Sequence, residues 1–163
     1  MKVCNAEIIK IIKDLEEKKQ DNLALELRTS VVRYQTSEDR IKTDYDFTAT
    51  RNKIAELNSE IRRLKHLLNI SNATVIIEEF DMTIGECLVY MAQLNNEKAV
   101  LDRMSNMDPK TRYSTGAIGG GIEYAELEYD IGECKAKFNE VKETVRKLQL
   151  AIDRINLTNM IEI

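Results

Sequence analysis

The stretch YDFTATRNKIAELNSEIRRLKHLLNISNAT, residues 45–74, aligns without gaps with YDIGECKAKFNEVKETVRKLQLAIDRINLT, residues 129–158. The two stretches are 84 positions apart and share eight identities in 30 positions. Chance would give about two at average residue frequencies. Apolar positions coincide as well, for example Ile54 with Phe138. This agreement favours duplication of one structural unit.

We therefore predict an internal repeat in which residues 1–74 and 82–158 each form a long helical hairpin. Apolar residues recur in alternating steps of 3 and 4 through both halves, which is typical of amphipathic helices in coiled coils. The most regular series is Ile131, Cys134, Phe138, Val141, Val145, Leu148, Ile152 and Ile155. The expected fold is mainly α, with two pseudo-repeated hairpins forming an antiparallel four-helix bundle or coiled coil.

Local signals fix where the long helices begin and end. Asp46 is a good N-cap for a helix that starts at Phe47, because its carboxylate can accept a hydrogen bond from a free backbone N–H group. Thr83 and Glu86 have the spacing of a capping box, which predicts a third helix from about Thr83. The single proline, Pro109, should mark the end of that helix.

The inserts between the helices, residues 28–45 and 112–129, contain runs that are typical of strands. RTSVVRYQ in the first insert is β-branched and aromatic, and IEYAELEY in the second follows a glycine-rich stretch. We expect each insert to carry a strand and to contribute a small antiparallel β element. Whether the two inserts pair with each other is left open by the sequence.

Composition favours one helical domain over residues 1–163. The chain is 43% hydrophobic, 32% charged and only 6% aromatic. Its net charge of −4 argues against nucleic acid as a partner, because phosphate backbones would be repelled. Neither a signal peptide nor a membrane span is expected from hydropathy, which argues against a membrane partner. Three widely spaced cysteines fit reduced residues of a cytoplasmic protein.

The repeated triplets Asn72-x-Thr74 and Asn156-x-Thr158 are the most informative polar positions. Duplication places the same amide and hydroxyl at the end of both long helices. One interpretation is C-capping, since asparagine tolerates the left-handed conformation and a hydroxyl can satisfy a terminal carbonyl. The alternative is a symmetric polar pocket where both helix ends meet.

Arg112, Tyr113 and Ser114 precede glycines at positions 116 and 119–121. This stretch lacks the lysine and hydroxyl pattern of a phosphate-binding loop, so it indicates a hairpin tip. The alternative is a loop that becomes ordered on a partner.

Other polar residues do not form a recognisable chemical site. His66 lies among cations on a helix, and Glu78, Glu79 and Asp81 lack the spacing of a calcium loop. We therefore predict no catalytic residues, no metal ligands and no cofactor.

Five segments together resemble a family of small bacterial proteins called septicolysin-like: KVCNAEI, NISNAT, DMTIGECLVYMAQLN, RYS and LQLAIDRINLTN. The resemblance covers nearly the whole chain. The family's polar positions are occupied by Asn72, Thr74, Arg112, Tyr113, Ser114, Asn156, Thr158 and Asn159. The first insert and the glycine run depart from the family pattern, and Met160 replaces a usual aromatic residue. The resemblance implies a bacterial, cytoplasmic, helical protein without an established activity.

The leading functional prediction is a non-enzymatic helical scaffold or interaction protein that forms a homo-oligomer. The reason is that two long series of apolar residues present more apolar surface than a thin bundle can cover. One alternative is a small-ligand or metal-binding protein, or an enzyme, with a polar site at one end of the bundle. A second alternative, suggested by the family label, is a membrane-active cytolysin. Mixed-charge helices argue against the second alternative.

Overall fold

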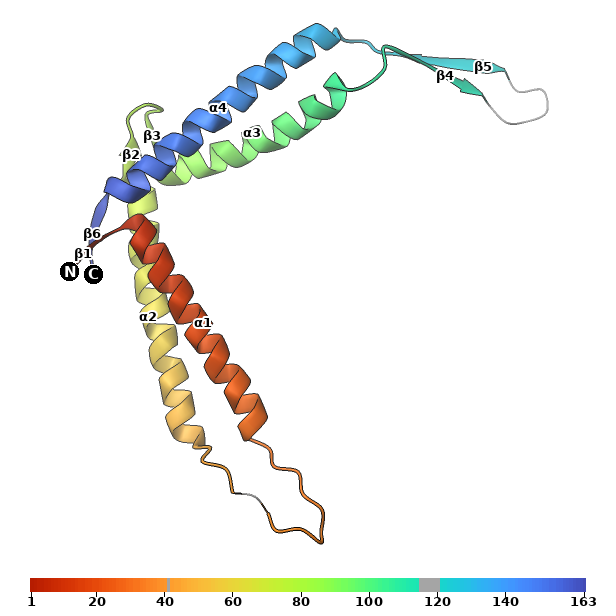
Figure 1. Cartoon of the computed structure of the whole chain (residues 1–163). Coiled ribbons are helices and arrows are strands. Elements are labelled where there is room, and N and C mark those ends of the chain that lie inside the picture. Colours follow the sequence, from red (N-terminus) through yellow and green to blue (C-terminus); the bar gives the residue numbers. More distant parts are fainter. Residues whose placement is uncertain (41, 115–120) are drawn as a thin grey trace. The chain divides into compact units, whose positions relative to one another are not determined.

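The computed structural model describes residues 1–40, 42–114 and 121–163 of a mainly helical protein (Figure 1). Within these ranges the helices are α1 (Asn5–Thr29), α2 (Phe47–Thr74), α3 (Ile84–Ser105) and α4 (Ile131–Thr158). Three antiparallel strand pairs accompany them: β1 (Lys2–Cys4) with β6 (Met160–Glu162), β2 (Ile76–Ile77) with β3 (Met82–Thr83), and β4 (Lys110–Ser114) with β5 (Ile122–Glu126). The prediction of a mainly helical chain with small antiparallel β elements is confirmed.

Contacts divide the chain into two compact units. Unit 1 comprises Met1–Val75 and Arg154–Ile163, and unit 2 comprises Ile76–Asp153. Unit 1 therefore holds α1, α2, the β1–β6 pair and the last residues of α4. Unit 2 holds α3, most of α4 and the other two strand pairs.

The helices begin where capping chemistry predicts. The Asp46 carboxylate accepts a hydrogen bond of 2.9 Å from the backbone N–H of Ala49 at the start of α2. At the start of α3, Thr83 and Glu86 form the reciprocal capping box, with the Thr83 backbone N–H donating to the Glu86 carboxylate at 2.8 Å. Hydrogen bonds from the backbone and side chain of Thr83 lower the pKa of Glu86.

The core of unit 1 lies where β1 and the first turns of α1 meet the second half of α2. Its buried side chains are Val3, Ile8, Ile12 and Leu64, against which Ile11, Leu15, Leu68, Ile161 and Ile163 pack. Packing weakens toward the other end of α1, where Leu25 is 51% exposed.

In unit 2, α3 and α4 form the second hairpin. The Tyr129 hydroxyl donates to the backbone carbonyl of Met104 at 2.9 Å, and Ser105 Oγ lies 3.4 Å from Cys134 Sγ. These contacts join the last turn of α3 to the beginning of α4. All eight predicted seam positions of α4 are buried or half-buried, so the apolar series identified this face correctly.

The prediction that both inserts carry strands is wrong for the first one. Residues 30–40 and 42–46 form no strand, whereas the second insert supplies both strands of the β4–β5 hairpin. A strand needs a paired neighbour to satisfy its backbone, and propensity alone does not provide one. The first insert has a single β-branched run, followed by a turn in which the Glu38 N–H donates to the Gln35 carbonyl.

The two long C-terminal helices of the hairpins have matched bounds. Helices α2 and α4 each contain 28 residues, and both their first and their last residues are 84 positions apart (131 − 47 and 158 − 74). Strand β2 follows α2 and pairs with β3, which precedes α3. Strand β6 follows α4 and pairs in the same register with β1, which precedes α1. The pairs are Ile76 with Thr83 and Ile77 with Met82, and Met160 with Cys4 and Ile161 with Val3.

Candidate functional site

A buried polar cluster lies in unit 1, where the beginning of α1, the end of α2 and the end of α4 meet. Its members are Asn5, Ser71, Asn156 and Asn159. Asn5 has no exposed surface and Ser71 is 5% exposed. Two fully or nearly fully buried side chains thus meet two half-buried asparagines from a segment far away in the sequence.

The hydrogen bonds of this cluster are mutual. Asn5 Nδ2 donates to Ser71 Oγ at 3.1 Å and to Asn156 Oδ1 at 3.3 Å. Asn159 Nδ2 donates to Ser71 Oγ at 2.9 Å and to Asn5 Oδ1 at 3.2 Å. Across the described residues, every buried side-chain nitrogen or oxygen has a partner. The cluster is therefore complete without a ligand, and its chemistry fits a structural tie between three chain segments.

The repeated Asn-x-Thr triplets have unequal roles. Thr74 and Thr158 behave alike, since each hydroxyl donates to the carbonyl four residues earlier, at 2.8 and 2.9 Å. The predicted role of the hydroxyls at helix ends is confirmed. Asn156 joins the buried cluster, whereas Asn72 lies inside α2 and takes no part in it. The suggestion that these asparagines end the helices in the left-handed conformation is wrong, because only Asp81 among the described non-glycine residues has a positive φ.

Arg112, Tyr113 and Ser114 lie on β4 in unit 2, apart from the asparagine cluster of unit 1. All three side chains are exposed. Arg112 pairs across the hairpin with Tyr124, and Tyr113 pairs with Glu123. The predicted glycine tip lies mostly at residues 115–120, outside the described residues. These three positions form part of the surface of the β4–β5 hairpin.

Asn5 and Ser71 were missed as site residues, although the sequence contained a signal. Asn5 lies three residues before buried Ile8 and seven before buried Ile12, on the same helix face. Ser71 continues the α2 seam after Leu64 and Leu68 in a step of 3. A polar residue at an apolar seam position must find a buried partner, and this rule would have found both.

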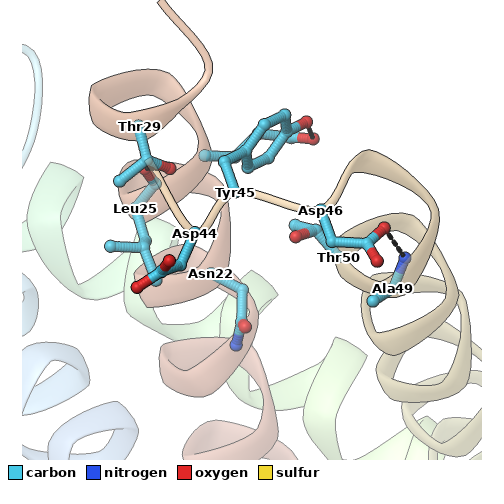
Figure 2. A pocket seen from close by; sticks show the side chains of 9 residues that line it. Asn22, Leu25, Thr29, Asp44, Tyr45, Asp46, Ala49 and Thr50 are labelled. Atoms are coloured by element: carbon cyan, nitrogen blue, oxygen red, sulfur yellow. Dashed lines mark hydrogen bonds between the residues drawn. The ribbon is translucent and has the colours of Figure 1, made fainter. Parts of the chain in front are cut away.

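A cavity of about 460 Å³ lies in unit 1, between the last turns of α1 and the beginning of α2 (Figure 2). Its lining consists of Asn22, Leu25, Glu26, Thr29, Asp44, Tyr45, Asp46, Ala49 and Thr50. The central group is Glu26, which is only 7% exposed. Its carboxylate accepts a hydrogen bond of 2.9 Å from the Tyr45 hydroxyl and forms an ion pair with Arg51. The buried Glu26 carboxylate therefore has two partners, the Tyr45 hydroxyl and the Arg51 guanidinium.

This arrangement changes the acid–base behaviour of Tyr45. Burial, followed by the hydrogen bond and the negative charge of Glu26, raises the pKa of the Tyr45 hydroxyl, while Arg51 acts in the opposite direction. Because the folded pKa lies above the unfolded value of about 10, the contribution to stability is complete below that pH. It is lost as the pH rises through the folded pKa.

We expect Glu26→Gln to lower the pKa of Tyr45 toward its ordinary value, because the neutral amide removes the negative charge beside the hydroxyl. An NMR titration with ¹³C-labelled tyrosine measures this directly. Glu38→Gln is the control, since Glu38 bonds the backbone N–H of Gln35 in the preceding loop. An unchanged Tyr45 titration in Glu26→Gln would contradict the assignment.

Most polar groups that line the cavity are already engaged within the protein. Asn22 and Thr29 donate to backbone carbonyls of α1, at 2.6 and 2.8 Å. Asp46 caps α2. Elsewhere in the chain, the Thr83 hydroxyl bonds the Glu86 carboxylate at 2.8 Å, and this pair serves the capping box of α3. The lining of the cavity therefore suits a small polar ligand.

In the part of the chain that the structure describes, no group of three or more histidine, cysteine, aspartate or glutamate side chains is placed to hold a metal ion. Likewise, each described helix is too short or too polar to cross a membrane.

Comparisons with known proteins bear on the fold. No protein-family model and no curated protein matches the sequence. A crystal structure of a functionally unknown conserved protein from Corynebacterium diphtheriae is similar, with a TM-score of 0.68 and 17% sequence identity. The alignment covers 99% of this chain and 100% of that chain. At this identity the similarity shows a shared fold alone.

Proposed function

We propose that this protein is a non-enzymatic helical scaffold or interaction protein that associates with itself. The observation that carries the proposal is the exposed apolar surface on α3. Val89 and Val100 are 59% and 46% exposed, on the side of the helix away from buried Ile84, Cys87 and Leu94. Helices with apolar residues on both sides are normally covered on both sides.

The charge distribution supports the same proposal. Helix α3 has five charged residues among 22, whereas α1 has 11 among 25. A helix that faces water on one side usually carries its charges there. Helix α3 thus carries few charges for a helix with one side in water, and its exposed valines suit contact with another protein.

Light scattering over a range of protein concentrations, with and without divalent metals, tests the proposed function. We expect a discrete oligomer whose mass does not respond to metal, because the proposed contacts need no metal ligands. A chain that keeps its monomer mass of 18.8 kDa at every concentration would contradict self-association. A mass change with one metal would instead favour the ligand-binding alternative.

We also propose that the two hairpins descend from one duplicated unit. The equal lengths and constant offset of α2 and α4 support this proposal, as does the equal register of the strand pairs that follow them. Tyr45 and Tyr129 are also 84 positions apart, and each hydroxyl donates to a group near the end of the preceding helix. Tyr45 donates to the Glu26 carboxylate, and Tyr129 donates to the Met104 carbonyl. The four-helix bundle and the resemblance to septicolysin-like proteins stay predictions.

A second candidate function, binding of a small polar ligand, is favoured by the cavity beside Glu26. Its volume of about 460 Å³ falls within the usual range of ligand pockets, roughly 300 to 1,000 Å³. Asp44 is exposed at its edge and would favour a cationic ligand. This candidate ranks second because most of the other polar groups of the cavity are already hydrogen bonded.

A further inference from the structure

The outer face of α3 carries a second seam of residues, distinct from the buried one. Its members are Glu86, Val89, Gln93, Asn96, Val100 and Arg103, in alternating steps of 3 and 4. All six are exposed. A groove of about 520 Å³ lies over the first half of this face, between Met82 and Gln93. The spacing is that of the contact positions in a coiled coil.

Two copies of this seam are complementary to each other when the two helices run in opposite directions. In an antiparallel pair of identical helices, with a twofold axis between Leu94 and Asn95, position n faces position 189 − n of the second copy. Val89 then faces Val100, and Gln93 faces Asn96. Each pairing occurs twice because the interface is symmetric. The two apolar pairs thus flank a centre of amides, which can both donate and accept hydrogen bonds.

The charged ends of the seam fit the same arrangement. Glu86 faces Arg103 of the second copy, so opposite charges meet at both ends of the interface. A parallel pair would place Glu86 against Glu86 and Arg103 against Arg103, which is repulsive. An antiparallel pair shifted by one heptad would place Val89 against Gln93. Charge and polarity therefore favour one orientation and one register.

Small residues beside the seam would permit close approach of the two helices. Gly85, Ala92 and Ala99 recur every seven residues along one flank of the outer face, and helix separation depends on side-chain size at the contact. Met82 and Met107 continue the self-complementary order just beyond the two ends of α3, and Met107 is 50% exposed. On each side of the uncharged centre, the interface thus has an ion pair between Glu86 and Arg103 and, beyond it, a methionine.

We propose that the outer face of α3 is a homodimer interface in which α3 of one copy packs antiparallel against α3 of a second copy. The inference rests on the proposed self-association and specifies its surface, orientation and register. Helix α3 spans about 33 Å for its 22 residues. One pair of such helices buries an area at the low end of specific interfaces, so we expect a dissociation constant in the micromolar range, about 1 to 100 μM.

Sedimentation velocity of the full chain and its variants tests this interface. Val89→Glu should weaken the dimer at least about tenfold, because it places an unpaired carboxylate against Val100 of the second copy. Val89→Glu with Val100→Lys should recover most of that loss, since opposite charges then face each other twice. Leu27→Glu on α1, where Leu27 is 80% exposed, is the matched control and should leave association unchanged.

A cross-link tests the register independently. Val89→Cys with Val100→Cys should give a covalent dimer under mild oxidation, because each new thiol faces its counterpart in the second copy. The two positions are 11 residues, about 16 Å, apart on one helix and cannot bridge within a chain. The natural cysteines, Cys4, Cys87 and Cys134, are buried and free.

The outcomes distinguish this interface from the proposed function. If the unmodified chain is monomeric up to about 100 μM, both proposals fail. If it associates but Val89→Glu and Leu27→Glu have equal effects, or no covalent dimer forms, self-association stands and the α3 interface is overturned. Circular dichroism of each variant verifies that loss of association is not loss of folding.

Discussion

Replacing Asn5 by alanine should destabilise unit 1 by about 3 kcal/mol. Asn5 has no exposed surface, and its side chain bonds Ser71, Asn156 and Asn159. Alanine removes all of these bonds and leaves the partner groups buried without them. Each such group costs about 1 to 3 kcal/mol, and partial access of water to Asn156 and Asn159 reduces the total. Urea unfolding followed by circular dichroism measures the change.

Asn22→Ala is the matched control for this experiment. Asn22 lies on the same helix, and its side chain bonds only the Lys18 carbonyl at the surface, so the effect should stay within about 0.5 kcal/mol. A double-mutant cycle of Asn5→Ala with Ser71→Ala should give a coupling of at least about 1 kcal/mol, because the two side chains are direct partners. Equal midpoints for Asn5→Ala and Asn22→Ala would show that the cluster does not stabilise the fold.

Truncation of either fully buried leucine of the repeat should be comparably severe. Leu64 and Leu148 are 84 positions apart, and neither has any exposed surface. Leucine-to-alanine changes in protein cores cost about 2 to 5 kcal/mol, through lost burial and the cavity that remains. We expect Leu64→Ala and Leu148→Ala each to fall in this range, as measured by thermal unfolding.

The control for Leu148→Ala is Leu150→Ala, two residues further along α4. Leu150 is 50% exposed, so its truncation should cost less than about 1 kcal/mol. If Leu64→Ala were costly but Leu148→Ala were not, the two positions would not be equivalent and the proposed duplication would lose support. If neither were costly, the assignment of both side chains to packed cores would be wrong.

Local sequence signals predicted the helices because their causes are local. The N-cap carboxylate of Asp46 and the capping box of Thr83 and Glu86 satisfy backbone groups within one helical turn. The seam of α4 follows from residue spacing alone. In contrast, the β-branched run at Val31 and Val32 does not form a strand, because strand formation needs a partner segment that spacing along the chain does not specify.

The candidate sites were harder to predict because they depend on which segments meet. Asn156 was identified as a polar position of interest, but its partner Asn5 lies 151 residues away along the chain. Ser71, which bonds Asn5 in the same cluster, lies 85 residues from Asn156. Glu26 gave no sequence signal that distinguished it from the many charged residues of α1. It is buried because the loop before α2 brings Tyr45 and Arg51 against it.

By itself, the sequence determined the helical class of this protein, the ends of its long helices and the faces that they bury. These properties follow from periodicity and capping, which act within a few residues. Only the tertiary structure decided that Asn5, Ser71, Asn156 and Asn159 close one buried network and that Glu26 is paired. It also left the outer face of α3 exposed. Burial and pairing depend on contacts between distant segments, and these contacts are set by the fold as a whole.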